Sequence, residues 1–495
     1  MNRFVFVPLA VVACGGCAAE AAPPPATPLA SPMPVLAPPT QASVAPATPE
    51  DPLRAAPPAT SDDWQPTGDS GQAFTLPNGM RVVVVERHGI PFVNARLAIP
   101  QAVPSKDPKA DLRNSLASQV FLSPRDPGDH LGGWCGSVDC GVDAWGASSE
   151  LGDLLRREAA LVRTEPARAE SERRLALASR GYAMSAGEPS ANARRSAGVL
   201  LFGYDHPYAA PADAPSALTL DDLLSWRRSA FVPAGATLVL VGDVTLAQTK
   251  AVVTRYFGDW RGQAGPRGPS AHPVALPPLP DGPRALFTQN GYLPTDYAAV
   301  VARGPAWGDP DVAAALVAVE IYEAPLPRPA PCREMENRRP TSRQRVPLAF
   351  LPSVSVATLG GSFAPKTALA QIRGVLEAIR ASREAEVSEA TLTRAKRLAV
   401  AQWRRREDDW GALASTVNVA LDAGALEGAF GFEDKIASVT AADVRRIAER
   451  YFAEDAVRVV IIGEQEHFRA LKELGVGGAQ PVDTYARPTG LGWMM

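Results

Sequence analysis

The sequence predicts an α+β fold built from two homologous halves. Residues 219–243 repeat at residues 440–464 without a gap, at a constant offset of 221. Antiparallel strand patterns occur together with long helix patterns in both copies. The 495 residues, 46% of them hydrophobic, are enough for large cores and exclude wholesale disorder. A net charge of −3 gives no electrostatic basis for binding nucleic acid.

The N-terminus has the pattern of an export signal. Residues 1–13 carry one cation followed by a short apolar run, too short for the roughly 20 residues that span a bilayer. The run ends in Cys14-Gly15, which looks like a bacterial lipobox, so we assign residues 1–17 to a lipoprotein-type signal and Cys14 to lipidation. Cys17 is a competing acceptor, and a cleaved signal without lipid is the alternative. We expect an exported protein of the cell envelope, an outer-membrane lipoprotein that faces the periplasm.

The segment after the signal predicts a tether. Residues 18–68 are rich in Pro and Ala and cannot bury enough apolar surface to offset their ordering entropy. An extended Pro-rich chain of that length reaches at most roughly 150 Å. The remaining boundaries are an N-terminal half at 69–262, a Pro/Gly-rich linker at 263–283, a C-terminal half at 284–480 and a tail at 481–495.

Each copy of the repeat predicts a capped helix followed by a buried strand. Thr219 and Thr440 are each followed three residues later by an aspartate, which is close to a capping box. The apolar β-branched runs 238–241 and 459–462 predict strands, and each ends in a glycine and an acid.

Further elements are expected in chain order. Asn78-Gly79 predicts a turn between two strand runs. The segment Val93–Ile99 alternates, with Asn94 and Arg96 expected to point outward. The helix patterns lie at residues 111–121, 148–163, 168–186, 310–323, 365–383 and 388–410.

These residues together resemble the insulinase/pitrilysin family of zinc metallopeptidases. The opening segment TLPNGMRVVVVE (75–86), the landmarks LFGYDHPY (201–208) and YFGDW (256–260) and the two repeats occur in the family's order, over roughly residues 70–475. The resemblance implies a mitochondrial processing peptidase-like sandwich in each half. It also implies a chamber in which an extended peptide joins a sheet edge.

The family's chemistry requires an inverted zinc motif, His-x-x-Glu-His, on the first helix after the opening strands. Aligned on this resemblance, Asn114 and Ser118 stand at the two His positions and Ala117 at the general base. Arg180 or Gly181 stands near the third ligand, which is a Glu in the family. We therefore predict no catalytic residue, no metal ligand and no bound cofactor, although zinc is expected for the family.

The histidine and cysteine inventory supports the same prediction without the alignment. No two of the five histidines (88, 130, 206, 272 and 467) lie within forty residues of each other, so no single helix can supply two His ligands. Cys135 and Cys140 with His130 could form an alternative zinc site, but a disulfide or two free thiols are the other possibilities in an exported protein. The redox state of Cys332 is left open.

A second family feature, an Arg and a Tyr seven residues apart that hold substrate, is also altered. Arg333 matches the Arg and is our candidate substrate-binding residue, but Pro340 stands where the Tyr is expected. The five arginines in 333–345 predict either a solvated basic loop or a docking patch for an acidic partner or peptide terminus. His206-Pro207-Tyr208 matches a structural turn of the family rather than a catalytic group.

The sequence thus predicts a non-catalytic partner subunit of an active zinc peptidase of the same family. That subunit would be held at the membrane by an N-terminal lipid anchor and could contact peptide. The alternatives are an independent peptide-binding or scaffold lipoprotein of the envelope, or an active zinc endopeptidase with an atypical site.

Overall fold

The computed structural model describes residues 71–101, 109–124, 128, 130–136, 139–185, 187–206, 208–209, 218–262, 275–289, 295–326, 347–351 and 353–489. The chain divides into two compact units, residues 1–67 and 68–495, and all described residues belong to the second unit. The predicted signal, Cys14 and the tether lie outside the described residues, as do Arg333 and Cys332. Within the described part, no helix is both long and apolar enough to cross a membrane.

The first half contains a six-stranded sheet in the order β1-β2-β6-β3-β5-β4. β2 and β6 are parallel, and the other neighbours are antiparallel. Its strands are β1 (Gln72–Thr75), β2 (Arg81–Glu86), β3 (Phe92–Pro100), β4 (Leu131–Cys135), β5 (Asp139–Ala147) and β6 (Thr237–Gly242). The predicted turn at Asn78-Gly79 joins β1 to β2, with Gly79 at a φ of 88° that favours glycine.

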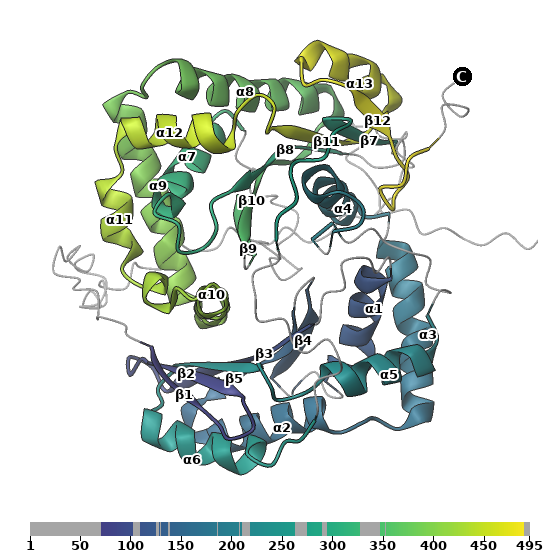
Figure 1. The fold of residues 1–495 in the computed structure, drawn as a ribbon, viewed down its shortest axis with the longest axis vertical. Coiled ribbons are helices and arrows are strands. Elements are labelled where there is room, and N and C mark those ends of the chain that lie inside the picture. The colour runs from purple at the N-terminus through teal and green to yellow at the C-terminus, as the bar shows by residue number, and fades with distance from the viewer. Residues whose placement is uncertain are drawn as a thin grey trace, which may run out of the picture. The chain divides into compact units, whose positions relative to one another are not determined.

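The second half repeats five strands of this sheet, in the order β12-β7-β11-β8-β10-β9, in which β12 takes the edge position of β1 but is parallel to its neighbour. Its parallel central pair, β7 and β11, corresponds to β2 and β6. The strands are β7 (Ala285–Gln289), β8 (Asp296–Gly304), β9 (Leu348–Leu351), β10 (Val354–Phe363), β11 (Arg458–Gly463) and β12 (Ala479–Pro481). The shared order confirms the predicted α+β fold of two homologous halves (Figure 1).

The predicted helices are present with boundaries shifted by a few residues, and the structure also has helices at 189–202, 246–257, 410–422, 432–438 and 465–470, which the sequence analysis did not predict. The helices of the first half are α1 (Ala110–Ala117), which continues as a π-helical turn η1 (Ser118–Leu122), α2 (Leu151–Arg163), α3 (Arg168–Ser185), α4 (Pro189–Phe202), α5 (Leu220–Ala230) and α6 (Leu246–Phe257). Those of the second half are α7 (Val312–Tyr322), α8 (Pro365–Glu384), α9 (Glu389–Asp408), α10 (Trp410–Asp422), α11 (Phe432–Ser438), α12 (Ala441–Tyr451) and α13 (Gln465–Ala470).

The repeated segment has the same local structure in both halves. Thr219 caps α5 and Thr440 caps α12, each in a complete capping box with the aspartate three residues later. The strands that follow, β6 and β11, are buried along their whole length. The repeated glycine has a steric reason, because a Cβ at Gly242 would lie 2.3 Å from the Phe92 carbonyl oxygen and one at Gly463 would lie 2.6 Å from the Asp296 carboxyl carbon.

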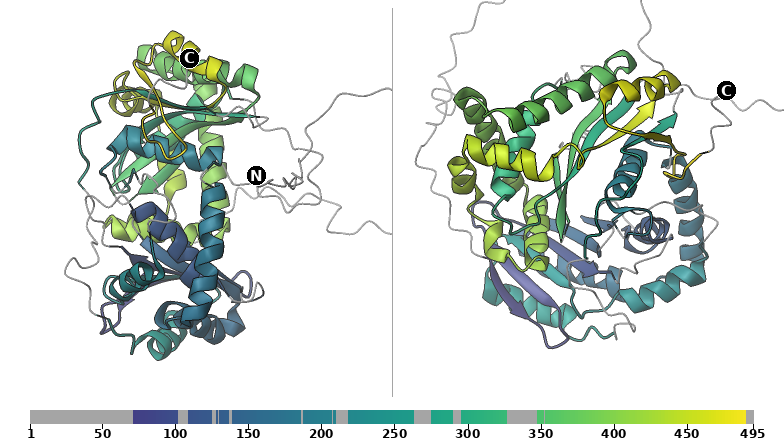
Figure 2. Two further views of the ribbon diagram at one scale, coloured as in Figure 1. Left: turned by 90° about the vertical axis from the view of Figure 1, so that its right-hand side faces the viewer. Right: turned by 45° about the horizontal axis from the view of Figure 1, so that its top comes forward.

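The two halves exchange one helix each, which the predicted boundaries at 69–262 and 284–480 did not include. α4 belongs to the first half in sequence but packs on β8 and β11 of the second sheet. α10 belongs to the second half but packs on β3 and β6 of the first sheet. Figures 1 and 2 show α8 and α12 on the side of the second sheet opposite α4. Because each sheet needs the other half's helix to cover one face, the halves form a single folding unit.

The exchange also corrects the expected exposure of β3. Asn94 was expected to point into solvent, but it is buried, because α10 covers that face of the sheet. Val83 and Val241, on the same face, join the core cluster of the second half. Arg96, which is partly buried, forms an ion pair instead of facing bulk water.

The segment predicted as a tail, residues 481–495, is described up to residue 489 and packs on the second half. β12 adds a parallel strand to β7, and Val482 and Ala486 are buried against α4. Arg195 of α4 donates a hydrogen bond to the Thr484 carbonyl oxygen at 3.1 Å. This segment therefore belongs to the second core.

Candidate functional site

The helix that should carry the zinc motif is present, and its three key positions serve packing. Asn114 is only 6% exposed, and its side-chain amide donates to the Gly136 carbonyl oxygen at 2.7 Å. Ala117 is fully buried in the core cluster of the first half. The Ser118 hydroxyl donates to the Ser115 carbonyl oxygen of its own helix at 2.9 Å. None of these three groups is a zinc ligand of the family's kind.

The third position does not supply a ligand either. Arg180 is exposed on α3 and is not part of the cavity wall beside α1. Gly181 is exposed, and a Cβ there would lie 3.8 Å from the Gln119 side-chain oxygen of η1. The residues of α3 that line the cavity with Asn114 and Ser118 are Tyr182 and Ser185. The sequence alignment missed both of them, because it followed family positions rather than the face of α3 that meets α1.

The end of β4 forms the wall opposite α1 and is closed by a disulfide. Cys135 and Cys140 pair across the β4–β5 hairpin with an S–S distance of 2.10 Å. Of the alternatives left open by the sequence, the structure has the disulfide, so these thiols are not available to a metal. Gly136 follows Cys135 directly, so the disulfide closes this end of the hairpin and the Asn114 hydrogen bond connects it to α1.

The donor set does not fit a zinc ion. Among the described residues, no group of three His, Cys, Asp or Glu side chains lies close enough to hold a metal. His88 contacts Asp243 at 2.8 Å on the surface, and His467 contacts Asp296 at 2.9 Å in the second half, and neither histidine lines the cavity beside α1. A hydrolytic step through zinc therefore has no support from these residues.

His206 and Tyr208 have the structural role that the sequence indicated. The His206 ring stacks on Phe202 at 5.2 Å between centroids, and its Nδ1 accepts the Tyr208 backbone N–H at 3.2 Å. The Tyr208 hydroxyl pairs with the Ser353 hydroxyl at 2.8 Å, which ties this turn to the second sheet.

A cluster of charged groups lies where α10 meets the first sheet. Arg96 contacts Asp143 at 2.8 Å and lies over the Trp134 ring, with its guanidinium carbon 3.9 Å from the centroid. Arg81 of β2 pairs with Asp422 of α10 at 2.7 Å and joins the two halves. Burial raises the pKa of Asp143 and of Asp422, while their arginine partners oppose the rise.

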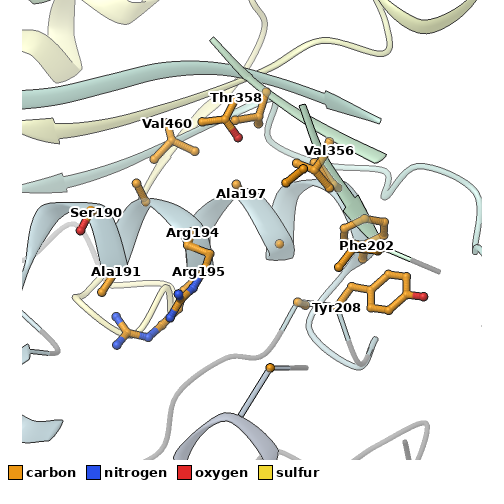
Figure 3. A pocket seen from close by; sticks show the side chains of 18 of the residues that line it. Ser190, Ala191, Arg194, Arg195, Ala197, Phe202, Tyr208, Val356, Thr358 and Val460 are labelled. Atoms are coloured by element: carbon orange, nitrogen blue, oxygen red, sulfur yellow. The ribbon is translucent and has the colours of Figure 1, made fainter. Parts of the chain in front are cut away.

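A cavity of about 540 Å³ lies between the two halves, beside the altered zinc helix. Its walls come from α1, the end of β4, the C-terminal part of α3, most of α4 and the strands β8 to β11. Figure 3 shows Val460, Thr358 and Val356 on the sheet side of α4, Phe202 and Tyr208 near its C-terminal end, and Arg194 and Arg195 leaving α4 away from those strands. The Arg194-Arg195 pair, which precedes the apolar run at residues 197–202, was a signal in the sequence that could have identified this wall.

Comparisons with known proteins agree with this architecture. Residues 217–325 match the family model described as the peptidase M16 inactive domain. No curated protein matches the sequence. A protease from Helicobacter pylori superposes with a TM-score of 0.62 at 15% identity, covering 80% of this chain and 99% of that one.

Two further structures have the same fold. A chain of Complex III2 from Candida albicans, with Inz-5 bound, has a TM-score of 0.62 at 12% identity and covers 82% of this chain and 99% of its own. A peptidase M16 inactive domain from Pseudomonas fluorescens has a TM-score of 0.60 at 15% identity, with 80% and 98% covered. The match of residues 217–325 to the peptidase M16 inactive domain and the fold shared with M16-like structures support an insulinase-family member without the His-x-x-Glu-His site.

Proposed function

We propose that this chain is a non-catalytic subunit that pairs with a zinc-bearing peptidase of the same family in the bacterial cell envelope. The observation that carries the proposal is α1, which keeps its place in the fold while Asn114, Ala117 and Ser118 make packing contacts instead of ligating metal. Enclosing a substrate requires only the folded walls, whereas hydrolysis requires one intact site.

A second observation supports a subunit role. The Complex III2 chain from Candida albicans has this fold and is part of a larger assembly. A chain with this fold can therefore be part of a larger assembly, and we extend a subunit role to this chain.

The proposed location rests on the N-terminal sequence. Lipidation at Cys14 would anchor the chain to a membrane, and residues 18–68 would hold the body at a distance from it. We propose the outer membrane, with the body in the periplasm. A Cys14→Ser variant should then appear in the soluble periplasmic fraction, whereas retention in the membrane fraction would count against the lipid anchor.

The alternative is an independent envelope protein that binds peptides or other ligands without cutting them. The cavity between the halves favours this alternative, because a volume of about 540 Å³ is in the range of ligand-binding sites. An active zinc endopeptidase with an atypical site is the third possibility, and the donor set around α1 argues against it.

Purification of the full chain from native membranes distinguishes these functions. After mild cross-linking and affinity capture, we expect a stoichiometric partner that carries His-x-x-Glu-His, with zinc in the complex and none in this chain when it is separated. The Cys14→Ser variant, captured from the periplasm, controls for partners that associate only through lipid. Capture of the chain alone would favour the independent binding protein, and one tightly bound zinc per isolated chain would refute the non-catalytic assignment.

A further inference from the structure

The charge of the cavity between the halves is one-sided. Of the residues that line it, only Arg194 and Arg195 are charged, and none is an aspartate or glutamate. Arg195 is 3% exposed and is engaged with the Thr484 carbonyl oxygen. Arg194 is exposed, and no ion pair or hydrogen bond to it occurs within the described part of the chain. The cavity therefore contains one cationic group whose hydrogen-bond donors are available to a ligand.

A neutral hydroxyl lies on the same helix as that cation. Ser190 is one helical turn before Arg194 on α4 and also lines the cavity, whereas the Ser185 hydroxyl, at the end of α3, donates to the Tyr182 carbonyl oxygen at 3.0 Å. A guanidinium with a hydroxyl one turn away suits a carboxylate, because the guanidinium donates two parallel N–H bonds and the hydroxyl of Ser190 supplies a further donor.

The other end of the cavity is apolar and rigid. Phe202 and Tyr208 meet edge to face at 5.3 Å between centroids, and Val356 and Leu351 lie across from them on the second sheet. Tyr208 is fixed by its hydrogen bond to Ser353. Figure 3 shows the aromatic pair and Arg194 at different ends of α4, so that one ligand would contact both if it were elongated.

We propose that this cavity binds an apolar chain that ends in a carboxylate, with the carboxylate on Arg194 and the chain against Phe202, Tyr208 and Val356. An acyl chain and the C-terminal residues of an apolar peptide share this chemistry. The binding uses residues of α4 and the second sheet and requires no metal. The inference is independent of whether the chain has a partner subunit.

Calorimetric titration of the full chain with dodecanoate, below its micelle concentration, tests the proposal. We expect saturable binding with one site per chain, and we expect dodecanol to bind about tenfold to a hundredfold more weakly, since it lacks the charge-assisted hydrogen bonds. Arg194→Gln should weaken dodecanoate by a similar factor and leave dodecanol unchanged. Arg397→Gln, an exposed arginine on α9 away from the cavity, is the matched control and should bind like the wild type.

A variant at the apolar end keeps the test independent of Arg194. Val356→Trp should weaken dodecanoate more than hexanoate, because the larger ring occupies the space of the distal methylenes. Thermal melting of each variant identifies any that fail to fold.

Two peptide ligands identify the source of the carboxylate. A Leu-rich tetrapeptide with a free C-terminus is compared with its amidated form. If only dodecanoate binds, the ligand is a fatty acid. If only the free-acid peptide binds, the ligand is a peptide C-terminus. Either result supports the proposal, provided that the binding is weakened in Arg194→Gln. Absence of one-site binding by both anions, or an unchanged Kd in Arg194→Gln, would overturn it.

Discussion

Asp139 is expected to make the contact between the two halves sensitive to pH. It is the first residue of β5, and its carboxylate lies 3.5 Å from the side-chain nitrogen of Asn418 on the exchanged helix α10. Burial raises the pKa of Asp139 to about 7, the Arg96 guanidinium opposes this rise, and Asp422 and Asp143 add to it. The carboxyl group is therefore protonated in the folded protein at pH values where it is ionised in the unfolded chain.

The sign of the effect follows from proton linkage. Between an ordinary aspartate pKa of 3.8 and about 7, the folded state holds the proton and the unfolded state has released it. The contribution of Asp139 to the free energy of unfolding is therefore fully present below pH 3.8, and it is lost as the pH rises from there through 7. Three pKa units correspond to an upper limit of about 4 kcal/mol. We expect about 1–2 kcal/mol, because a group that is not completely enclosed is partly solvated when it ionises.

Asp139→Asn tests this directly, since the amide keeps the shape of the side chain and removes its charge. The free energy of unfolding of residues 68–495 is measured with urea and tryptophan fluorescence at intervals from pH 4 to 8.5. The variant should match the wild type at pH 4 and become more stable by about 1–2 kcal/mol above pH 7. Asp281→Asn, at an exposed position, controls for the loss of one negative charge and should give a flat difference. A flat or negative difference for Asp139→Asn would refute the reasoning.

Four further substitutions probe other parts of the fold. Thr440→Ala removes a complete capping box and should lower the free energy of unfolding by about 1 kcal/mol, measured by urea titration. Gly133→Ala should be strongly destabilising in thermal melting, because its Cβ would lie 2.2 Å from the Leu122 carbonyl oxygen, whereas Gly152→Ala on α2 meets nothing within 4 Å and should stabilise by about 0.5–1 kcal/mol. Glu158→Gln should stabilise increasingly as pH rises, because burial raises the pKa of Glu158 well above its usual range; equal pH profiles for variant and wild type would contradict this.

The local structure of the repeat could be predicted because its signals are local. A threonine with an aspartate three residues later predicts a cap wherever the helix packs, and β-branched runs of four or more residues predict buried strands. Both capping boxes and both strands are present in the structure. The repeated glycine is also part of the pattern, although its reason, a close approach of another strand, is visible only in three dimensions.

The positions of the exchanged helices, α4 and α10, could not be predicted from local sequence signals. Periodicity shows which face of a helix is apolar but not which sheet that face covers. Every residue of α4 from 195 to 202 is buried, as in a helix that is covered on several sides. The sequence does not reveal this burial, because the first residues of the helix are polar. The prediction also extended the preceding helix to residue 410, where α10 in fact begins with Asp409 as its cap. The side chains of the cavity were missed for the same reason, because they come from both halves.

The side chains of α1 at the positions of the zinc motif contribute to packing. Placing the family's residues at positions 114, 117 and 118 would therefore not create a zinc site. A Glu at Ala117 would place a carboxylate in a fully buried apolar cluster, where its desolvation would oppose ionisation. A His at Asn114 would remove the amide that holds the end of the disulfide-closed hairpin through Gly136. The third ligand would still be missing, because the position of α3 that faces α1 is occupied by Tyr182. Asn114, Ala117 and Ser118 each make a structural contact of their own, so these three positions contribute to packing of the fold rather than to metal binding.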